Sequence, residues 1–175
     1  MPRIKPIVEF ADEDWAWQFD MSARHVFLAT QIVGPLIGKS GGGTMVYVSS
    51  TSAVSVSADR AAYGASKAAL QQFVKASAIE FGDMGVRINA VAPGLVATPR
   101  VKGNLSEDSR AKAASLYPLG AIGEPSQIAS VILFLASELS AHVNGQTVFA
   151  EGGVLASSPL HSATTTAAKV TGGLS

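Results

Sequence analysis

Residues 45–67 read MVYVSSTSAVSVSADRAAYGASK, and this stretch indicates the class of fold. Its first residues form an apolar run that is typical of a β-strand, and the run leads to the hydroxyl group of Ser50. After a polar loop, a helix is predicted from Arg60, with Tyr63 and Lys67 one turn apart on the same face. If the strand is parallel to its neighbour, Ser50 lies at the strand's carboxyl end, where open α/β sheets bind ligands.

Ser50, Tyr63 and Lys67 are a set of groups suited to proton transfer. A free phenol, with a pKa of about 10, is a poor acid–base catalyst at neutral pH, but a neighbouring cation lowers that pKa. Lys67 can supply the cation, so Tyr63 could exchange a proton with an oxygen that alternates between alcohol and carbonyl. Ser50 could hydrogen-bond the same oxygen, and a nicotinamide cofactor would carry the hydride that such a reaction needs.

A resemblance to a known family rests on this stretch and on four later ones. Ser50, a gap of twelve residues and then YGASK at residues 63–67 resemble the active-site signature of the short-chain dehydrogenase/reductase family. Tyr-x-x-x-Lys alone is weak, because such pairs are common on solvated helices. The later stretches resemble the family's strands, cofactor loop and helices in the same order: RINAVAPGLVAT (87–98), PLGAIGEP (118–125), FLAS (134–137) and NGQTVFAEGG (144–153). The resemblance covers residues 8 to 155.

The expected fold class is α/β, a partial Rossmann-like (doubly wound) fold in which helices flank a short parallel sheet. The alternation of patterns predicts three parallel strands joined by right-handed crossovers. Predicted strands are 45–50, 86–91 and 146–150, and predicted helices are 12–38, 60–81, 107–117 and 126–137. Residues 1–155 are then the C-terminal part of a Rossmann-type domain. Residues 156–175, rich in Ser, Thr, Ala and Gly, are expected to be a disordered tail.

The resemblance also assigns catalytic roles. It makes Tyr63 the acid–base group, Lys67 the residue that tunes Tyr63 and orients the nicotinamide ribose, and Ser50 the residue that positions the carbonyl. Ser22 stands where the family usually has an asparagine that helps hold a water of a proton relay. Ser22 is therefore either a shorter relay residue or a small helix-packing residue. Gly64, beside Tyr63, does not help to discriminate between possible functions.

The resemblance implies NAD or NADP as the cofactor, without deciding between them. Val96 is expected to contact the carboxamide through its backbone. The residues expected to bind the nicotinamide half are Tyr63, Lys67, Pro93, Gly94, Val96 and Thr98. The alternative is that residues 93–98 are a strand-ending turn that binds no ligand.

Composition excludes several other classes of function. Lys plus Arg and Asp plus Glu both number 13, so no excess charge favours nucleic acid or a membrane surface. The chain has no cysteine, which excludes disulfides and thiolate metal sites, and its three histidines, at 25, 142 and 161, are scattered, so no metal site is expected. No apolar run is long enough to span a membrane and no signal-peptide pattern is visible, so a cytoplasmic location is expected.

One expected part of such an enzyme is missing from the sequence. No G-x-G-x-x-G phosphate turn precedes Trp15, and the glycines at 41–43 precede a strand, so they are interpreted as an ordinary turn. The chain is expected to correspond to the C-terminal portion of the enzyme, beginning after its fourth strand. The strand at 45–50 would then be an exposed edge that needs a covering partner. The family commonly dimerises through the helices that match 15–38 and 60–81, so a homo-oligomer is expected.

Three functions remain open at this stage. The first is an NAD(P)-dependent oxidoreductase that interconverts a small-molecule alcohol and ketone. The second is a truncated, non-catalytic relative that acts only through oligomerisation, and the third is one half of a split enzyme. Residues 99–117 match the family's substrate lid, which varies with substrate, so they do not identify the substrate.

Overall fold

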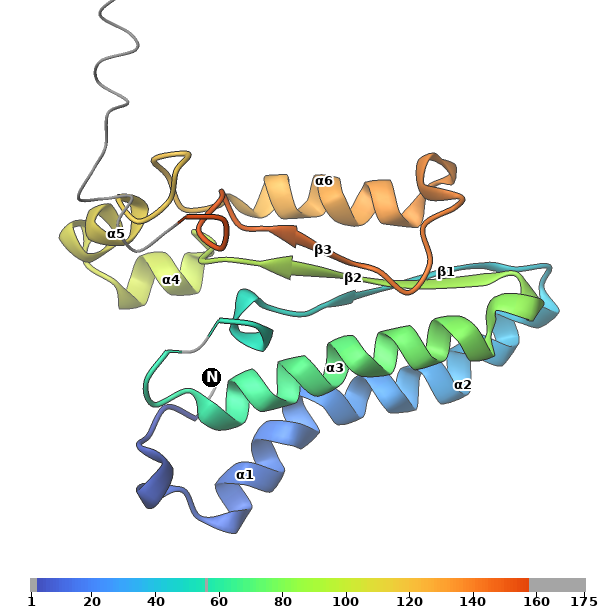
Figure 1. Cartoon of the computed structure of the whole chain (residues 1–175), viewed down its shortest axis with the longest axis horizontal. Helices are drawn as coiled ribbons and strands as arrows, with labels where there is room; N and C mark the ends of the chain where they lie inside the picture. Colours follow the sequence, from blue (N-terminus) through green and yellow to red (C-terminus); the bar gives the residue numbers. More distant parts are fainter. Residues whose placement is uncertain (1–2, 56, 158–175) are drawn as a thin grey trace, which may run out of the picture.

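A computed structural model describes residues 3–55 and 57–157, which form a three-stranded sheet between two layers of helices (Figure 1). The strands are β1 (Gly43–Val48), β2 (Val86–Pro93) and β3 (Thr147–Ala150). Both pairings are parallel, and β1 aligns with β2 from Gly43 opposite Val86 to Val48 opposite Val91. The predicted parallel α/β sheet is confirmed, and its carboxyl edge carries Ser50 just beyond β1.

The first long helix contains a π-helical turn that the sequence pattern did not predict. Helix α1 (Asp12–Phe19) passes through π-helical residues Asp20–Arg24 into α2 (His25–Lys39). Trp15 and Val33 follow one helical period in the sequence, but both are exposed in the structure. The wider π turn shifts the register of the face that packs inward. Buried positions recur instead at every fourth residue: Asp14, Gln18, Ser22, Val26, Thr30 and Gly34.

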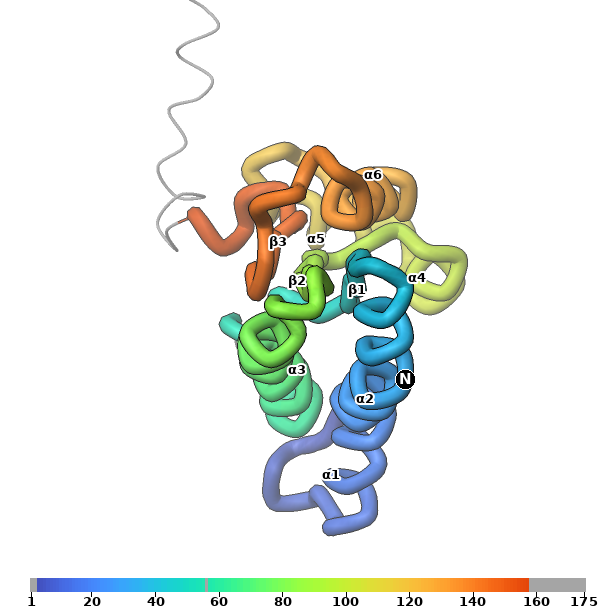
Figure 2. The backbone as a smooth tube through the Cα atoms, turned by 90° about the vertical axis from the view of Figure 1, so that its right-hand side faces the viewer, coloured from blue at the N-terminus to red at the C-terminus, as the bar shows by residue number. Residues whose placement is uncertain are grey.

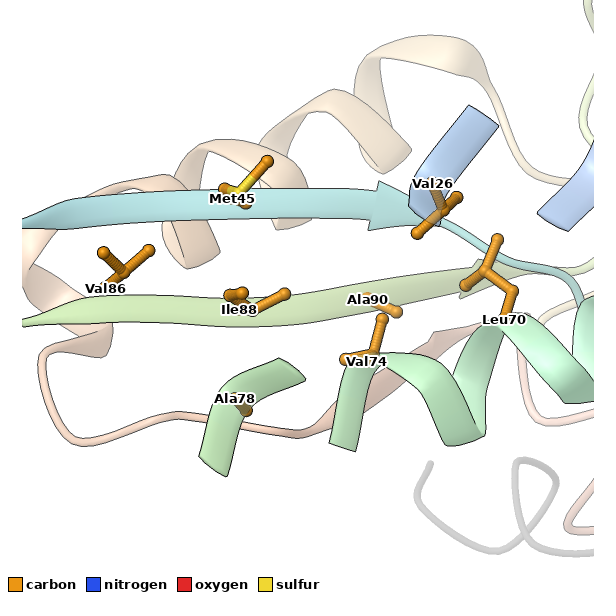
Figure 3. Packing of buried hydrophobic residues seen from close by; sticks show 8 residues of the cluster. All are labelled: Val26, Met45, Leu70, Val74, Ala78, Val86, Ile88 and Ala90. Carbon is orange, nitrogen blue, oxygen red and sulfur yellow. The ribbon is translucent and has the colours of Figure 1, made fainter. Parts of the chain in front are cut away.

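Helix α3 (Ala61–Glu80) packs beside α2 on one face of the sheet (Figure 2). Leu70 and Val74 are buried against the sheet, with Phe73 and Phe81 packed around them. Figure 3 shows Val26 of α2 next to Leu70 of α3, above the end of β2. The buried cluster on this face consists of Val26, Met45, Leu70, Val74, Ala78, Val86, Ile88 and Ala90.

The opposite face is covered by α6 (Pro125–Ala136), which buries Ile128 and Leu135 against Val91 (Figure 1). Side chains alternate between the two faces, so Ala90 and Val91 belong to different clusters. The strand order β1-β2-β3 advances in one direction, whereas α3 and α6 cover opposite faces. The two crossovers therefore have opposite hands, and the expectation of a right-handed second crossover is wrong. The long excursion of residues 94–146 lets the chain cross to the other face before β3.

The segment between β2 and α6 holds two short helices, α4 (Pro99–Asn104) and α5 (Glu107–Ala114), where one was predicted. Thr98 and Ser106 cap them through their side chains. Within residues 3–55 and 57–157, no helix combines the length and apolar character that a membrane span requires. The predicted disordered tail falls mainly on residues 158–175, which lie outside the described part of the chain.

Candidate functional site

Ser50 lies in extended backbone just after β1 and caps the 3₁₀ turn Thr51–Ala53. Its Oγ accepts a hydrogen bond from the Ser52 amide at 3.1 Å. A hydroxyl that accepts from a backbone amide keeps its own proton available for another acceptor. Ser50 can therefore donate to a substrate oxygen at the sheet edge without giving up its structural bond.

Lys67 is held between the end of β1 and Tyr63. Its Nζ donates to the Val48 carbonyl at 2.8 Å and lies 6.0 Å from the centre of the Tyr63 ring. Burial lowers the pKa of Lys67 below its ordinary value. The structure thus places Lys67 beside both groups that the sequence associated with it, the strand end and the phenol.

Hydrogen bonds of Ser49 form a second connection between the end of β1 and α3, which was not predicted from the sequence. The amide of buried Ser49 donates to the Val91 carbonyl at 2.7 Å, and Gln71 Nε2 donates to Ser49 Oγ at 3.0 Å. Ser49 Oγ also donates a hydrogen bond to the Lys67 carbonyl at 3.4 Å. Gln71 follows Lys67 by one helical turn, so its position on the face of Tyr63 was the signal available in the sequence.

Gly64 allows the loop after Ser50 to approach α3. A Cβ at this position would lie 2.8 Å from the Ser52 carbonyl oxygen. Real Cβ atoms do not approach a backbone oxygen so closely, so any larger residue must displace the turn Thr51–Ala53. Gly64 therefore sets the distance between the segment that carries Ser50 and the helix that carries Tyr63.

Ser22 is buried in the π-helical turn, and its hydroxyl is occupied by a structural contact. Gln18 Nε2 donates to Ser22 Oγ at 2.7 Å, and Gln18 Oε1 accepts from the Arg3 amide at 2.9 Å. Within the described residues, no hydrogen bond joins Ser22 to Tyr63 or Lys67. This geometry supports the helix-packing interpretation, and the relay role stays a prediction.

His25 is a neighbour of Lys67 that the sequence analysis counted only as scattered. It begins α2 and precedes Val26, which belongs to the same buried cluster as Leu70. Burial, followed by the charge of Lys67, lowers the pKa of His25 below its ordinary value. This shift favours the neutral imidazole form of His25 beside Lys67.

The turn after β2 is built around Tyr117. Tyr117 Oη accepts from the Leu95 amide at 2.8 Å, and a Cβ on Gly94 would lie 3.0 Å from the same oxygen. Pro93 is buried, and the Gly94 amide donates to the Ala150 carbonyl at 3.3 Å. The close packing against Tyr117 therefore explains a glycine at position 94 without any ligand.

Val96 and Thr98 follow this turn, and they differ in which hydrogen-bonding groups remain available to a ligand. Thr98 Oγ1 accepts from the Val101 amide at 3.2 Å as the N-cap of α4. The Val96 carbonyl accepts from the Thr98 amide at 2.8 Å, and a bridge to Gly123 uses the amide and carbonyl groups on either side of Val96. Within the described residues, the Val96 N–H makes no hydrogen bond, so it can donate to a ligand oxygen.

A cavity lies on the α6 side of the sheet, next to the turn after β2. It encloses about 750 Å³ between the end of the lid segment, α6 and β3, and Tyr117, Phe149 and Glu151 are among its lining residues. None of the predicted catalytic side chains lines it. Within the described part of the chain, no three His, Asp or Glu side chains gather closely enough to hold a metal ion.

Comparisons with known proteins agree with the interpretation of the motifs. A family profile described as enoyl-(acyl carrier protein) reductase matches residues 1–155. A 3-oxoacyl-[acyl-carrier-protein] reductase of Thermotoga maritima is 38% identical over 149 residues, which are 85% of this chain and 60% of the relative. A 7α-hydroxysteroid dehydrogenase of Bacteroides fragilis is 35% identical over 159 residues, which are 90% of this chain and 61% of the relative.

Solved structures resemble the chain over a similar range. Acetoin dehydrogenase from Enterobacter cloacae superimposes with a TM-score of 0.80 at 28% identity, covering 89% of this chain and 61% of that protein. The protein ElxO, solved with NADP bound, superimposes with a TM-score of 0.84 at 25% identity, covering 90% and 64%. The chain therefore spans about three fifths of the length of these relatives.

Proposed function

The chain belongs to the short-chain dehydrogenase/reductase family, and on this premise we propose that it is an NAD(P)-dependent oxidoreductase that interconverts a small alcohol and its ketone. The observation that carries the proposal is the position of the Lys67 ammonium, 2.8 Å from the Val48 carbonyl at the strand end and beside the Tyr63 ring. Ser50 follows the same strand with a hydroxyl proton free to donate.

In the reducing direction, Tyr63 gives its phenolic proton to the carbonyl oxygen of the substrate as that oxygen becomes a hydroxyl. The Lys67 ammonium stabilises the negative charge left on the Tyr63 oxygen, and Ser50 donates a hydrogen bond that holds the substrate oxygen. The hydride for the carbonyl carbon would come from a nicotinamide cofactor, when one is bound. Oxidation reverses each transfer, with Tyr63 taking the alcohol proton.

The residues after β2 fit the nicotinamide half of NAD or NADP. The free N–H of Val96 is a donor for the carboxamide oxygen, and Tyr63 and Lys67 offer donors for ribose hydroxyls. Pro93, Gly94 and Thr98 would form the adjoining wall. The NADP-bound structure of ElxO supports the choice of cofactor class.

Replacement of Tyr63 by Phe tests the proposal. The purified chain would be titrated with NADH and NADPH and then assayed for reduction of small ketones. Tyr63→Phe removes the proton donor, so turnover should fall by at least about 100-fold. Tyr47→Phe is the matched control, because Tyr47 bonds to Thr30 and takes no part in the proposed site. Undiminished turnover in Tyr63→Phe contradicts the proposed mechanism.

A non-catalytic role through association is the second candidate, and a specific observation favours it. Phe27, Ile32 and Leu36 are exposed along α2, and within the described residues β1 has no second strand partner. This surface fits a homo-oligomer through helices 15–38 and 60–81, or the other half of a split enzyme. No binding of either cofactor at millimolar concentration would favour this role, whereas saturable binding would favour the oxidoreductase.

A further inference from the structure

Residues 3–10 form a segment, here called the strap, that crosses from α1 to the loop between Ser50 and Tyr63. Within it, Lys5 bonds to α1 through its side chain and to the loop through its backbone. No motif in the sequence predicted either contact.

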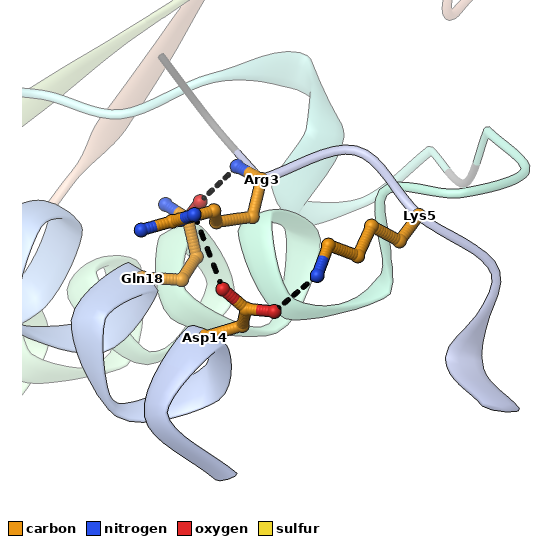
Figure 4. A network of polar contacts seen from close by, with 4 residues as sticks. All are labelled: Arg3, Lys5, Asp14 and Gln18. Carbon is orange, nitrogen blue, oxygen red and sulfur yellow. Dashed lines mark hydrogen bonds and ion pairs between the residues drawn. The ribbon is translucent and has the colours of Figure 1, made fainter. Parts of the chain in front are cut away.

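Asp14 fastens the strap to α1 (Figure 4). One carboxylate oxygen lies 3.2 Å from the Arg3 guanidinium, and the other accepts from the Lys5 ammonium. The Asp14 side chain is only 12% exposed, so both cations replace water around it. The hydrogen bond from Lys5 holds the pKa of Asp14 below its ordinary value, and the carboxylate is ionised at neutral pH.

Two further contacts align the strap with the helix. The Arg3 amide donates to Gln18 Oε1 at 2.9 Å, and Gln18 in turn donates to Ser22 at 2.7 Å. The Arg3 guanidinium also lies over the Trp17 ring, 4.8 Å from its centre. Asp14, Gln18 and Ser22 occupy the inward face of α1 and the π-helical turn, so the strap is anchored to a face that is itself packed.

At its other contact, the strap holds a residue in an unusual conformation. The Lys5 amide donates to the Asp59 carbonyl at 3.0 Å, and Asp59 has φ of 64°, the left-handed region. No other non-glycine residue in the described part of the chain has positive φ. Such a conformation persists where surrounding contacts enforce it. The described residues 57–59 receive one backbone hydrogen bond from outside the loop, and its donor is the Lys5 amide.

We propose that the strap positions the loop between Ser50 and Tyr63, and that Asp14 locks the strap in place. Asp14 is a positioning residue: it reaches the loop through Lys5 and touches no reacting group. Its effect on catalysis rests on the proposed function, whereas its effect on the loop does not. Without the Asp14–Lys5 contact, Asp59 can leave its left-handed conformation, and the turn that carries Ser50 can move relative to α3.

Hydrogen–deuterium exchange on the full chain, wild type against Asp14→Asn, tests the proposal without requiring activity. The neutral amide that this substitution introduces cannot replace the ionised carboxylate. Exchange in residues 51–55 and 57–60 should therefore rise about fivefold, the factor expected when one hydrogen bond no longer opposes opening. Exchange in α6, on the opposite face, should not change. Glu13→Gln is the matched control, because Glu13 is the exposed neighbouring acid and should leave the loop unchanged.

Two more variants keep the test decisive if Asp14→Asn folds poorly. Lys5→Met keeps the backbone donor to Asp59 but removes the ammonium, and it should loosen the loop in the same direction. Asp14→Glu keeps the charge and should restore protection. Faster exchange of residues 3–10 with unchanged exchange of residues 51–55 and 57–60 would overturn the proposal, since the strap would then be free while the loop stayed in place.

Activity separates failure of this proposal from failure of the proposed function. If the wild-type chain reduces ketones, Asp14→Asn should lower kcat while the affinity for NADPH stays unchanged. If the wild-type chain shows no turnover, the oxidoreductase proposal fails, but the exchange experiment still decides whether the strap holds the loop.

Discussion

At the scale of single residues, the pKa of Lys67 depends on the surroundings of its side chain. Its ammonium donates to the Val48 carbonyl and lies beside Tyr63, and burial lowers its pKa. His25 lies near enough to respond to the same charge. A protonated His25 would add a positive charge beside the Lys67 ammonium, and the lowered pKa of His25 opposes that protonation.

Replacement of Lys67 by Met should raise the pKa of His25, because a neighbouring positive charge disfavours the imidazolium form. The pKa should stay below its ordinary value, since burial is the larger cause and remains. Titration of the histidine ring signals by NMR measures the change, with His25→Gln to assign the signal. Lys75→Met, which removes an exposed lysine from the same helix, should leave the titration of His25 unchanged. A pKa that is the same in Lys67→Met and wild type would show that the two side chains do not interact.

At the scale of elements, the catalytic geometry depends on how closely the turn Thr51–Ala53 lies against α3. Gly64 permits that approach, Ser49 and Gln71 tie β1 to α3, and Lys5 holds the far end of the loop. A strand, a helix and the strap therefore all contribute to the position of Ser50 relative to Tyr63.

Gly64→Ala should destabilise the protein although alanine is the better helix former by about 1 kcal/mol. The added Cβ would meet the Ser52 carbonyl at 2.8 Å, and this backbone oxygen can move only with its turn. Gly103→Ala is the matched control, because Gly103 is also helical and its Cβ would meet nothing within 4 Å. Urea unfolding should give a lower midpoint for Gly64→Ala and an equal or higher midpoint for Gly103→Ala. An increase in stability for Gly64→Ala would show that the turn adjusts freely.

At the scale of the whole molecule, the sheet is covered on both faces but open at an edge. Within the described residues, β1 pairs only with β2, so its other edge presents unpaired backbone groups. Helix α2, which contacts β1, exposes Phe27, Ile32 and Leu36. Apolar side chains beside an open strand edge favour association.

The chain should therefore associate in solution, and Ile32→Lys should weaken the association. Ile32 is 62% exposed on α2, and a lysine there would place a charge in the apolar contact. Size-exclusion chromatography with light scattering, over a range of protein concentrations, measures the mass. Gln31→Lys adds the same charge at an adjacent exposed position and should have a smaller effect. A wild-type chain that stays monomeric at all concentrations contradicts this prediction.

The sequence by itself determined the elements whose patterns are local. The strand before Ser50 and the helix that carries Tyr63 and Lys67 follow from hydrophobic periodicity and from the spacing of the motif. These features need only residues that are close in the chain, and for that reason their bounds were predicted to within a few residues.

Only the tertiary structure decided how those elements meet. The hand of the second crossover, the π-helical turn that shifts the inward face of α1 and α2, and the approach of Ser52 to Gly64 each depend on how separate segments pack together. The pairs Lys5–Asp59 and His25–Lys67 likewise join segments that lie far apart in the chain. No local pattern encodes such pairs, because each forms only after the helices have packed against the sheet.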